Sequence, residues 1–141
     1  MSPQRFVVLL HEPGPNSVRI QTNHLDWMFE IDGQLRTWST DVVDMSHEMV
    51  STDADSLPDH RIDYLDIDGD IGQGRGSVRP IVTGIYSPVE VSEHRFAAWI
   101  ESESGLNQMR MMIIIQCSFD DEVPELDETR RRWSLSLSPG R

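Results

Sequence analysis

The sequence contains no lysine, so its 12 basic residues are all arginines, and they stand against 24 aspartates and glutamates. The resulting formal net charge of -12 repels phosphate backbones at long range. Broad non-specific binding of nucleic acid is therefore not expected. A small site with a local arginine is still compatible with this charge.

Cysteine and long apolar segments are also scarce. The single cysteine, Cys117, cannot form an internal disulfide, which fits a reducing cytoplasm. The apolar run Phe6 to Leu10 is too short for a signal-peptide core or a membrane span. We therefore expect a soluble cytoplasmic protein that makes no membrane contact. A chain of 141 residues is long enough to bury about 70% of its unfolded surface in one domain.

Apolar residues at the helical period are almost absent, whereas short β-rich runs bounded by Gly, Pro, Asn and Asp recur along the chain. The candidate runs cover residues 5–11, 18–21, 25–31, 34–39, 61–67, 77–86, 96–101 and 109–117. Residues 40–59 are polar and poor in strand formers, so we expect a long connection there with at most one helical turn. The pattern predicts an all-β fold, a small antiparallel β-barrel of about seven or eight strands with little helix.

Residues 120–141 differ in composition from the rest of the chain. They are first acidic, then basic at RRRW, and then low in complexity at SLSLSPGR. We expect residues 1–119 to form the barrel domain and residues 120–141 to form a flexible or lightly docked tail.

The clearest local signal is the stretch NHLDWMFEIDGQLRTW. Asp32-Gly33 between two alternating runs predicts a tight β-hairpin, because a type I′ turn needs two positive φ angles. In this register Trp27 lies opposite Trp38. Side chains alternate along a strand, so His24 and Asp26 point to the same face.

His24 and Asp26 would supply an imidazole nitrogen and a carboxylate oxygen from one strand, which is half of a site for a borderline metal. The bland alternative is a surface strand with two unrelated polar side chains. If a metal binds, further ligands must come from elsewhere, and His11 and His60 are the candidates.

Five motifs resemble, in order, those of the 3′-phosphoesterase domain of bacterial DNA ligase D, including its stand-alone versions. They lie between residues 5 and 86 and read RFVVLLHE, HLDWMFEIDG, LRTWS, DHRIDYLDIDG and GQGRGSVRPIVTGIY. The resemblance implies a small β-barrel whose polar crevice holds Mn²⁺ or another divalent transition metal such as Zn²⁺. It also implies removal of a 3′-phosphate or a terminal ribonucleotide during double-strand break repair by end joining, with DNA 3′ ends or repair proteins as partners.

Carried over by position, the resemblance implies that His11, His24 and Asp26 are the metal ligands. It implies that His60 contacts phosphate or assists proton transfer, with Tyr64 in a supporting role. Two imidazoles and a carboxylate with open positions suit a catalytic transition metal.

The chain departs from the family pattern in its phosphate-binding residues. The family strand reads His-x-Asp-x-Arg, and the third of these positions is Met28 here. Residues 48–58 contain no basic side chain where the family has a second arginine. Arg75 and Arg79, near the glycine-rich turn, are candidates to replace these contacts. Two hypotheses therefore stand: a metal-dependent phosphoesterase that processes 3′ ends, or a metal-binding or scaffold barrel of the same family without catalysis.

Overall fold

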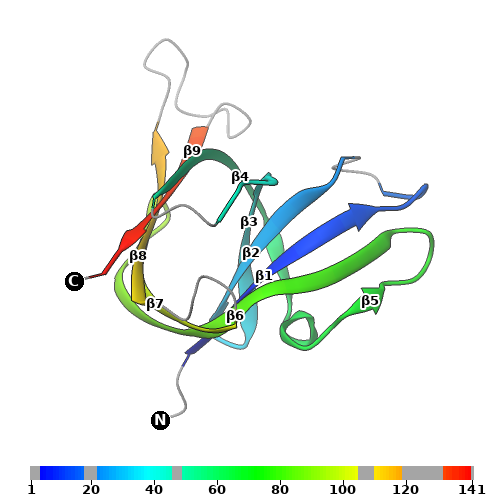
Figure 1. Cartoon of the computed structure of the whole chain (residues 1–141), viewed down its shortest axis with the longest axis horizontal. Coiled ribbons are helices and arrows are strands. Elements are labelled where there is room, and N and C mark those ends of the chain that lie inside the picture. Colours follow the sequence, from blue (N-terminus) through cyan, green and yellow to red (C-terminus); the bar gives the residue numbers. More distant parts are fainter. Residues whose placement is uncertain (1–3, 18–21, 46–48, 105–109, 119–131, 141) are drawn as a thin grey trace.

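The computed structural model describes residues 4–17, 22–45, 49–104, 110–118 and 132–140 (Figure 1). Within these ranges the chain is nearly all strand, with one short 3₁₀ helix. The elements are β1 (Gln4–Pro13), β2 (His24–Ile31), β3 (Gln34–Asp41), β4 (Val50–Arg61), η1 (Ile62–Leu65), β5 (Gly69–Asp70), β6 (Gly76–Val91), β7 (Arg95–Ser104), β8 (Arg110–Ser118) and β9 (Arg132–Pro139).

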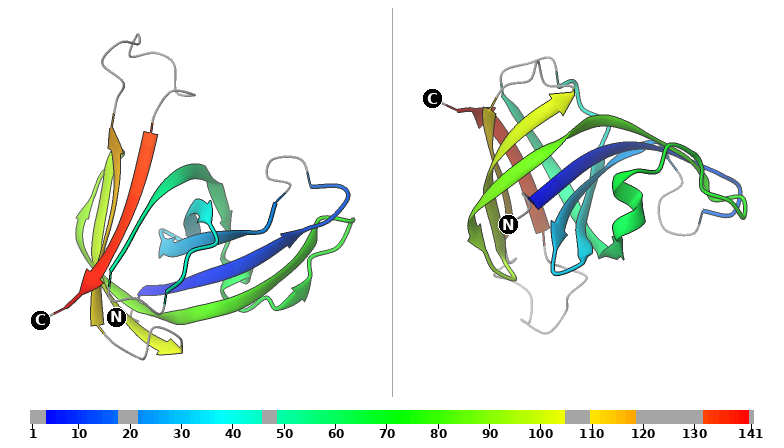
Figure 2. Two further views of the ribbon diagram at one scale, coloured as in Figure 1. Left: turned by 45° about the horizontal axis from the view of Figure 1, so that its top comes forward. Right: turned by 90° about the horizontal axis from the view of Figure 1, so that it is seen from below.

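The strands form one antiparallel sheet that closes into a ring. Their order is β1-β2-β3-β4-β9-β8-β7-β6-β5, and an additional pairing of β1 with β6 closes the ring. Two further views show β1 and β6 running side by side towards β5 (Figure 2). The all-β, antiparallel and barrel-like prediction is therefore confirmed.

The predicted hairpin is present as β2 and β3, with Trp27 opposite Trp38. Its turn residues have the required positive φ angles, 51° at Asp32 and 80° at Gly33. The two faces of β2 contact different apolar clusters. Trp27 and Phe29 belong to the ring core, whereas Met28 belongs to a second cluster on the opposite face.

The ring core takes aromatic side chains from strands all around the ring. Trp38 packs against Trp133 of β9 with ring centroids 5.7 Å apart, and Phe29 packs against Phe96 of β7 at 4.5 Å. Aromatic pairs at this spacing add to the apolar burial. The second cluster is smaller and is made of Val7, Leu9, Met28, Leu35, Leu65 and Val78. This second cluster lies on the same sheet face as the candidate site.

The prediction of a strand-poor connection over residues 40–59 was wrong. Residues 50–61 form β4, which pairs with β3 and with β9. Of this strand only Val50 and Ala54 are buried. Backbone pairing with two neighbouring strands therefore stabilises β4, although its residue types do not favour a strand. For this reason the composition of the segment failed to predict it.

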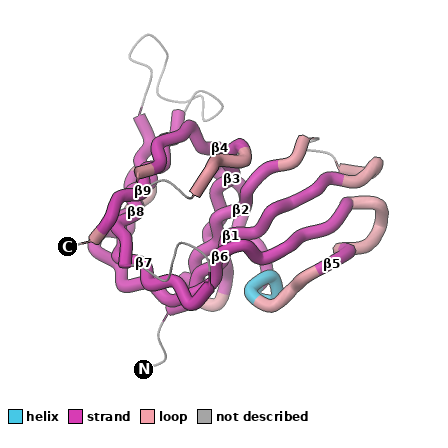
Figure 3. The backbone as a smooth tube through the Cα atoms, viewed as in Figure 1, coloured by secondary structure: helices cyan, strands magenta, loops and turns pink. Residues whose placement is uncertain are grey.

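The strand predicted over residues 61–67 is also absent. Ile62–Leu65 is instead the 3₁₀ helix η1, the helical turn of Figure 3. Leu65 is buried in the second cluster, and Ile62 and Tyr64 pack against it. Side chains three residues apart share one face of a 3₁₀ helix, so a single turn covers the cluster.

The tail prediction was wrong for residues 132–139, which form β9 between β4 and β8. The repeat Trp-Ser-Leu-Ser-Leu is an alternating strand in which Trp133, Leu135 and Leu137 are buried. The low complexity of this segment is strand periodicity, with serine on the exposed face.

Residues 120–131, like the strand predicted at residues 18–21, lie outside the described residues. In the described ranges no helix is both long enough and apolar enough to cross a membrane.

Candidate metal centre

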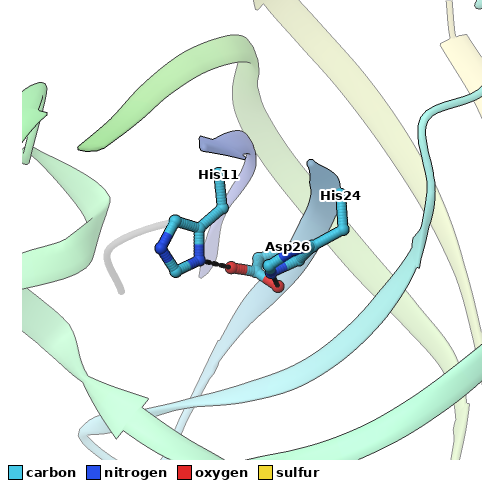
Figure 4. A group of neighbouring side chains, drawn as sticks. All are labelled: His11, His24 and Asp26. Carbon is cyan, nitrogen blue, oxygen red and sulfur yellow. Dashed lines mark ion pairs between the residues drawn. The ribbon is translucent and has the colours of Figure 1, made fainter. Parts of the chain in front are cut away.

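Strand pairing brings three of the predicted site residues together. His11 on β1 lies directly opposite His24 on β2, and Asp26 follows two positions along β2 on the same face. Because cross-strand neighbours have close Cβ atoms, this register places both imidazoles beside the carboxylate. Figure 4 shows the three side chains meeting. Their face of the sheet is the one opposite the ring core.

The donor atoms of these three residues form a compact group. One ligand atom from each lies within 4.8 Å of the others. The Asp26 Oδ2 atom lies 3.4 Å from His11 Nδ1, and its Oδ1 atom lies 3.2 Å from His24 Nε2. The group could therefore hold a metal ion between two imidazole nitrogens and a carboxylate.

The other nitrogen of each imidazole faces a backbone carbonyl. His24 Nδ1 lies 2.8 Å from the carbonyl oxygen of Thr22, and His11 Nε2 lies 3.1 Å from that of Arg75. A carbonyl only accepts, so these nitrogens are the donors. In the neutral rings the lone pairs of His24 Nε2 and His11 Nδ1 then point toward Asp26. Metal-binding histidines are commonly oriented in this way.

Asp26 is the most buried member of the group, with 4% of its side chain exposed. Burial tends to raise the pKa of its carboxyl, but the imidazoles of His11 and His24 outweigh burial and lower it. Burial tends to lower the pKa of His24, yet Asp26 and the Thr22 carbonyl raise it. Asp26 and His24 thus each favour the charged form of the other.

One atom of the group fits a bound cation better than a proton. Among the described residues the buried Asp26 Oδ1 atom has no hydrogen-bond partner, although His24 Nε2 lies within ion-pair distance of it. An unsatisfied buried carboxylate oxygen is costly. A cation among the three side chains would satisfy it, so the residues present fit a divalent transition metal.

The three residues line a cavity of about 280 Å³. The cavity also contains the two other predicted site residues, His60 and Tyr64. The described residues that line it are His11, Asn16, Ser17, His24, Asp26, Leu57, His60, Tyr64, Ile71 and Arg75. All five residues predicted from the motifs therefore lie in one cavity.

His60 reaches this cavity through a β-bulge. Thr37 pairs with Leu57 and Leu35 pairs with His60, so β4 has one more residue than β3 between these pairs. The extra residue lets Leu57 and His60 face the same side although they are three positions apart. The His60 Nδ1 atom lies 2.9 Å from the carbonyl oxygen of Pro58, and its ring meets Tyr64 edge-on at 5.3 Å.

Of the two arginines considered as phosphate contacts, Arg75 lines the cavity and Arg79 does not. Arg79 lies opposite Leu10, which packs against the ring core. Met28 is 1% exposed and packs in the second cluster. No pattern in the sequence indicated Asn16 and Ser17, because they enter the cavity through hydrogen bonds to the distant carbonyls of Gln73 and Arg75.

No protein-family model matches this chain, and no curated protein is similar enough to it to count as a match. By its fold and its site, the chain is an antiparallel, ring-closed all-β protein with a His-His-Asp group that could hold a metal ion.

Proposed function

We propose that this protein is a metal-dependent phosphoesterase acting on nucleic-acid 3′ ends, similar to the 3′-phosphoesterase domain of DNA ligase D. The substrate would be a 3′-phosphate or a terminal ribonucleotide at a DNA break. One observation carries the proposal: His11, His24 and Asp26 share a single cavity with His60 and Tyr64. These residues come from three separate motifs of the resemblance.

Mn²⁺ is the proposed metal, with Zn²⁺ as the other candidate. Imidazole and carboxylate donors suit both ions, and three protein ligands leave positions open for water and substrate. A bound divalent cation would polarise a phosphoryl oxygen and lower the pKa of a bound water. His11, His24 and Asp26 would hold it in the arrangement that their strands already fix.

His60 is proposed to move a proton at the scissile phosphate. Its Nδ1 faces the carbonyl of Pro58, so its Nε2 is the nitrogen available to a ligand. Tyr64 would keep the His60 ring in place by the edge-on contact. Proton transfer from a positioned imidazole typically contributes 10²–10⁴-fold to a rate.

A second candidate function is a metal-binding module of the same family without catalysis. The burial of Met28 favours it, because this position would carry a phosphate-binding arginine in the active family. A thioether offers no charged donor to phosphate. The two candidates share the metal centre and differ in turnover.

Metal binding is tested by titrating Mn²⁺ and Zn²⁺ into the metal-free protein and measuring heat and, for Zn²⁺, NMR shifts. We expect saturable binding that perturbs His11, His24 and Asp26 together. Asp26→Asn should weaken it strongly, whereas the matched control Asp53→Asn, exposed on β4, should not. No response at millimolar metal would remove both candidate functions.

Turnover is tested with a primer–template that ends in a 3′-phosphate or one ribonucleotide. The phosphoesterase should release phosphate or shorten the primer with Mn²⁺ present. His60→Gln should slow the reaction by about 10²-fold or more, whereas its exposed neighbour Asp59→Asn should react normally. Saturable metal binding with no turnover would favour the non-catalytic module.

A further inference from the structure

We propose that Arg75 is the anion-binding residue of the cavity and that it recognises a terminal phosphate monoester. The inference deepens the proposed function and rests on it for the identity of the anion. Two observations carry it. The Arg75 side chain lines the cavity, and the carbonyl oxygen of Arg75 is hydrogen-bonded to His11 of the metal group.

Among the described residues that line the cavity, Arg75 is the one arginine. Any ligand whose charge is negative must enter a protein with a formal net charge of -12. A local positive group is therefore needed beside the metal to offset this repulsion. A guanidinium also offers the planar fork of donors that phosphate oxygens accept.

The loop of residues 71–76 holds Arg75 in place through backbone hydrogen bonds. The amide of Arg75 donates to the carbonyl of Gly72 at 3.1 Å, and the amide of Ile71 donates to that of Gly76 at 3.0 Å. Asn16, which precedes the loop in the chain, also binds it: the backbone amide of Asn16 donates to the Gly74 carbonyl oxygen at 2.7 Å. A ligand group on such a loop is preorganised, which reduces the entropy lost on binding.

The Arg75 side chain is held but not neutralised. Its Nη2 atom donates to the Ile71 carbonyl at 2.8 Å and its Nε atom to that of Gly72 at 3.4 Å. Among the described residues no carboxylate pairs with it. A guanidinium has five N–H groups, so donors remain for an anion.

Other arginines of the protein differ in this respect. Arg5 pairs with Asp66 at 2.9 Å and Arg95 pairs with Glu90 at 2.6 Å. Both guanidiniums therefore already have a carboxylate partner. Arg75 lines the cavity and has no carboxylate partner among the described residues, which is the arrangement expected of an anion site rather than of a structural ion pair.

The carbonyl oxygen of Arg75 accepts from His11 Nε2 at 3.1 Å and from the Ser17 hydroxyl at 2.9 Å. The backbone of Arg75 is thus fixed relative to the metal group. An anion bound by the guanidinium lies beside the same cavity wall as His11 and Asp26. The geometry assigns Arg75 the phosphate contact that Met28 does not supply.

The test is calorimetric titration of the full chain, kept metal-free with EDTA so that no hydrolysis occurs. The probes are inorganic phosphate and two matched oligonucleotides, one ending in a 3′-phosphate and one in a 3′-hydroxyl. We expect the wild type to bind phosphate and to prefer the 3′-phosphate. Arg75→Gln should weaken binding by about tenfold or more. Arg75→Lys should retain part of it, and Arg79→Gln should change nothing.

Equal phosphate affinity in the wild type and Arg75→Gln would overturn the assignment, as would no phosphate binding by the wild type. Circular dichroism and a Zn²⁺ titration of Arg75→Gln check that its fold and metal group persist. If they are lost, the phosphate affinity of Arg75→Lys is compared with that of the wild type instead, and equal affinities would overturn the assignment. Phosphate binding through Arg75 without turnover would refute the phosphoesterase and leave this assignment intact. Turnover that Arg75→Gln leaves unchanged would refute this assignment and leave the phosphoesterase intact.

Discussion

The Nε2 atom of His11 lies 3.1 Å from the carbonyl oxygen of Arg75, 64 positions further along the chain. A hydrogen bond from a ligand histidine to a carbonyl sets which ring nitrogen is free for a metal. One wall of the metal centre therefore depends on how closely the loop of residues 71–76 approaches β1. Two glycines, Gly14 and Gly76, permit this approach.

Gly76→Ala should loosen this connection and weaken metal binding. A Cβ atom there would overlap the carbonyl oxygen of Glu12 and the amide of Gly14, and the φ angle of Gly76 is +97°. The loop must move away from β1, and His11 loses its oriented acceptor. Loss of such a supporting contact typically weakens metal affinity by about 10–100-fold. Metal titration of the variant measures this change.

Gly69→Ala is the matched control for the strain of a positive φ angle. The φ angle of Gly69 is +117°, but nothing lies within 4 Å of an added Cβ atom. This variant should lose about 1–2 kcal/mol of unfolding free energy through backbone strain, with metal affinity unchanged. Equal metal affinities for the two alanine variants would show that the His11–Arg75 contact does not orient the ligand.

Met28→Arg should destabilise the protein instead of supplying a phosphate contact. Met28 is 1% exposed in the second apolar cluster. An uncompensated charge at a buried position costs about 3–5 kcal/mol, whereas the volume-conserving control Met28→Leu should cost less than about 1.5 kcal/mol. Urea denaturation measures both. Near-wild-type stability of Met28→Arg would mean that the position opens onto the cavity.

Local signals in the sequence were sufficient for the hairpin and for two of the three residues of the metal group. The Asp32-Gly33 turn fixed the register of β2 and β3, and two-residue alternation placed His24 and Asp26 on one face. That His11 completes the group depends on the pairing of β1 with β2. Periodicity alone left His11 and His60 as equal candidates, and the family resemblance chose between them.

The parts that the sequence did not predict depend on contacts between distant segments. β4 has a polar sequence, and its pairing with β3 and β9 overrides its weak strand propensity. The bulge that directs His60 into the cavity arises within this same unpredicted strand. β9 was missed because serines on its exposed face made its alternation look like low complexity.

Leu135→Ala should show that β9 is an integral strand. Leu135 is fully buried in the ring core and pairs with Thr52 of β4 and Ile115 of β8. Removing its side chain should lower the free energy of unfolding by about 2–5 kcal/mol. The exposed neighbour Ser134→Ala should change it by less than about 0.5 kcal/mol. A lightly docked tail would tolerate both substitutions equally, which a thermal or urea melt would reveal.

Tyr86 links the ring core to the end of the hairpin. Its hydroxyl donates to the carbonyl oxygen of Glu30 at 2.6 Å, and its ring meets Phe29 edge-on. Burial, followed by the negative charges of Glu30 and Asp32, raises the pKa of Tyr86. The folded protein therefore keeps a proton that the unfolded chain releases above about pH 10.

Replacing this hydroxyl should alter stability in a pH-dependent way. Below about pH 10 the wild type should exceed Tyr86→Phe by about 0.5–1.5 kcal/mol, the value of a typical hydrogen bond. Above that pH the unfolded state gains stability by losing the proton, so the advantage of the wild type should shrink with each further pH unit. Tyr64→Phe, which keeps Tyr86, should retain this alkaline loss. Urea denaturation between pH 8 and pH 11 measures the difference, and a constant gap across that range would contradict the raised pKa of Tyr86.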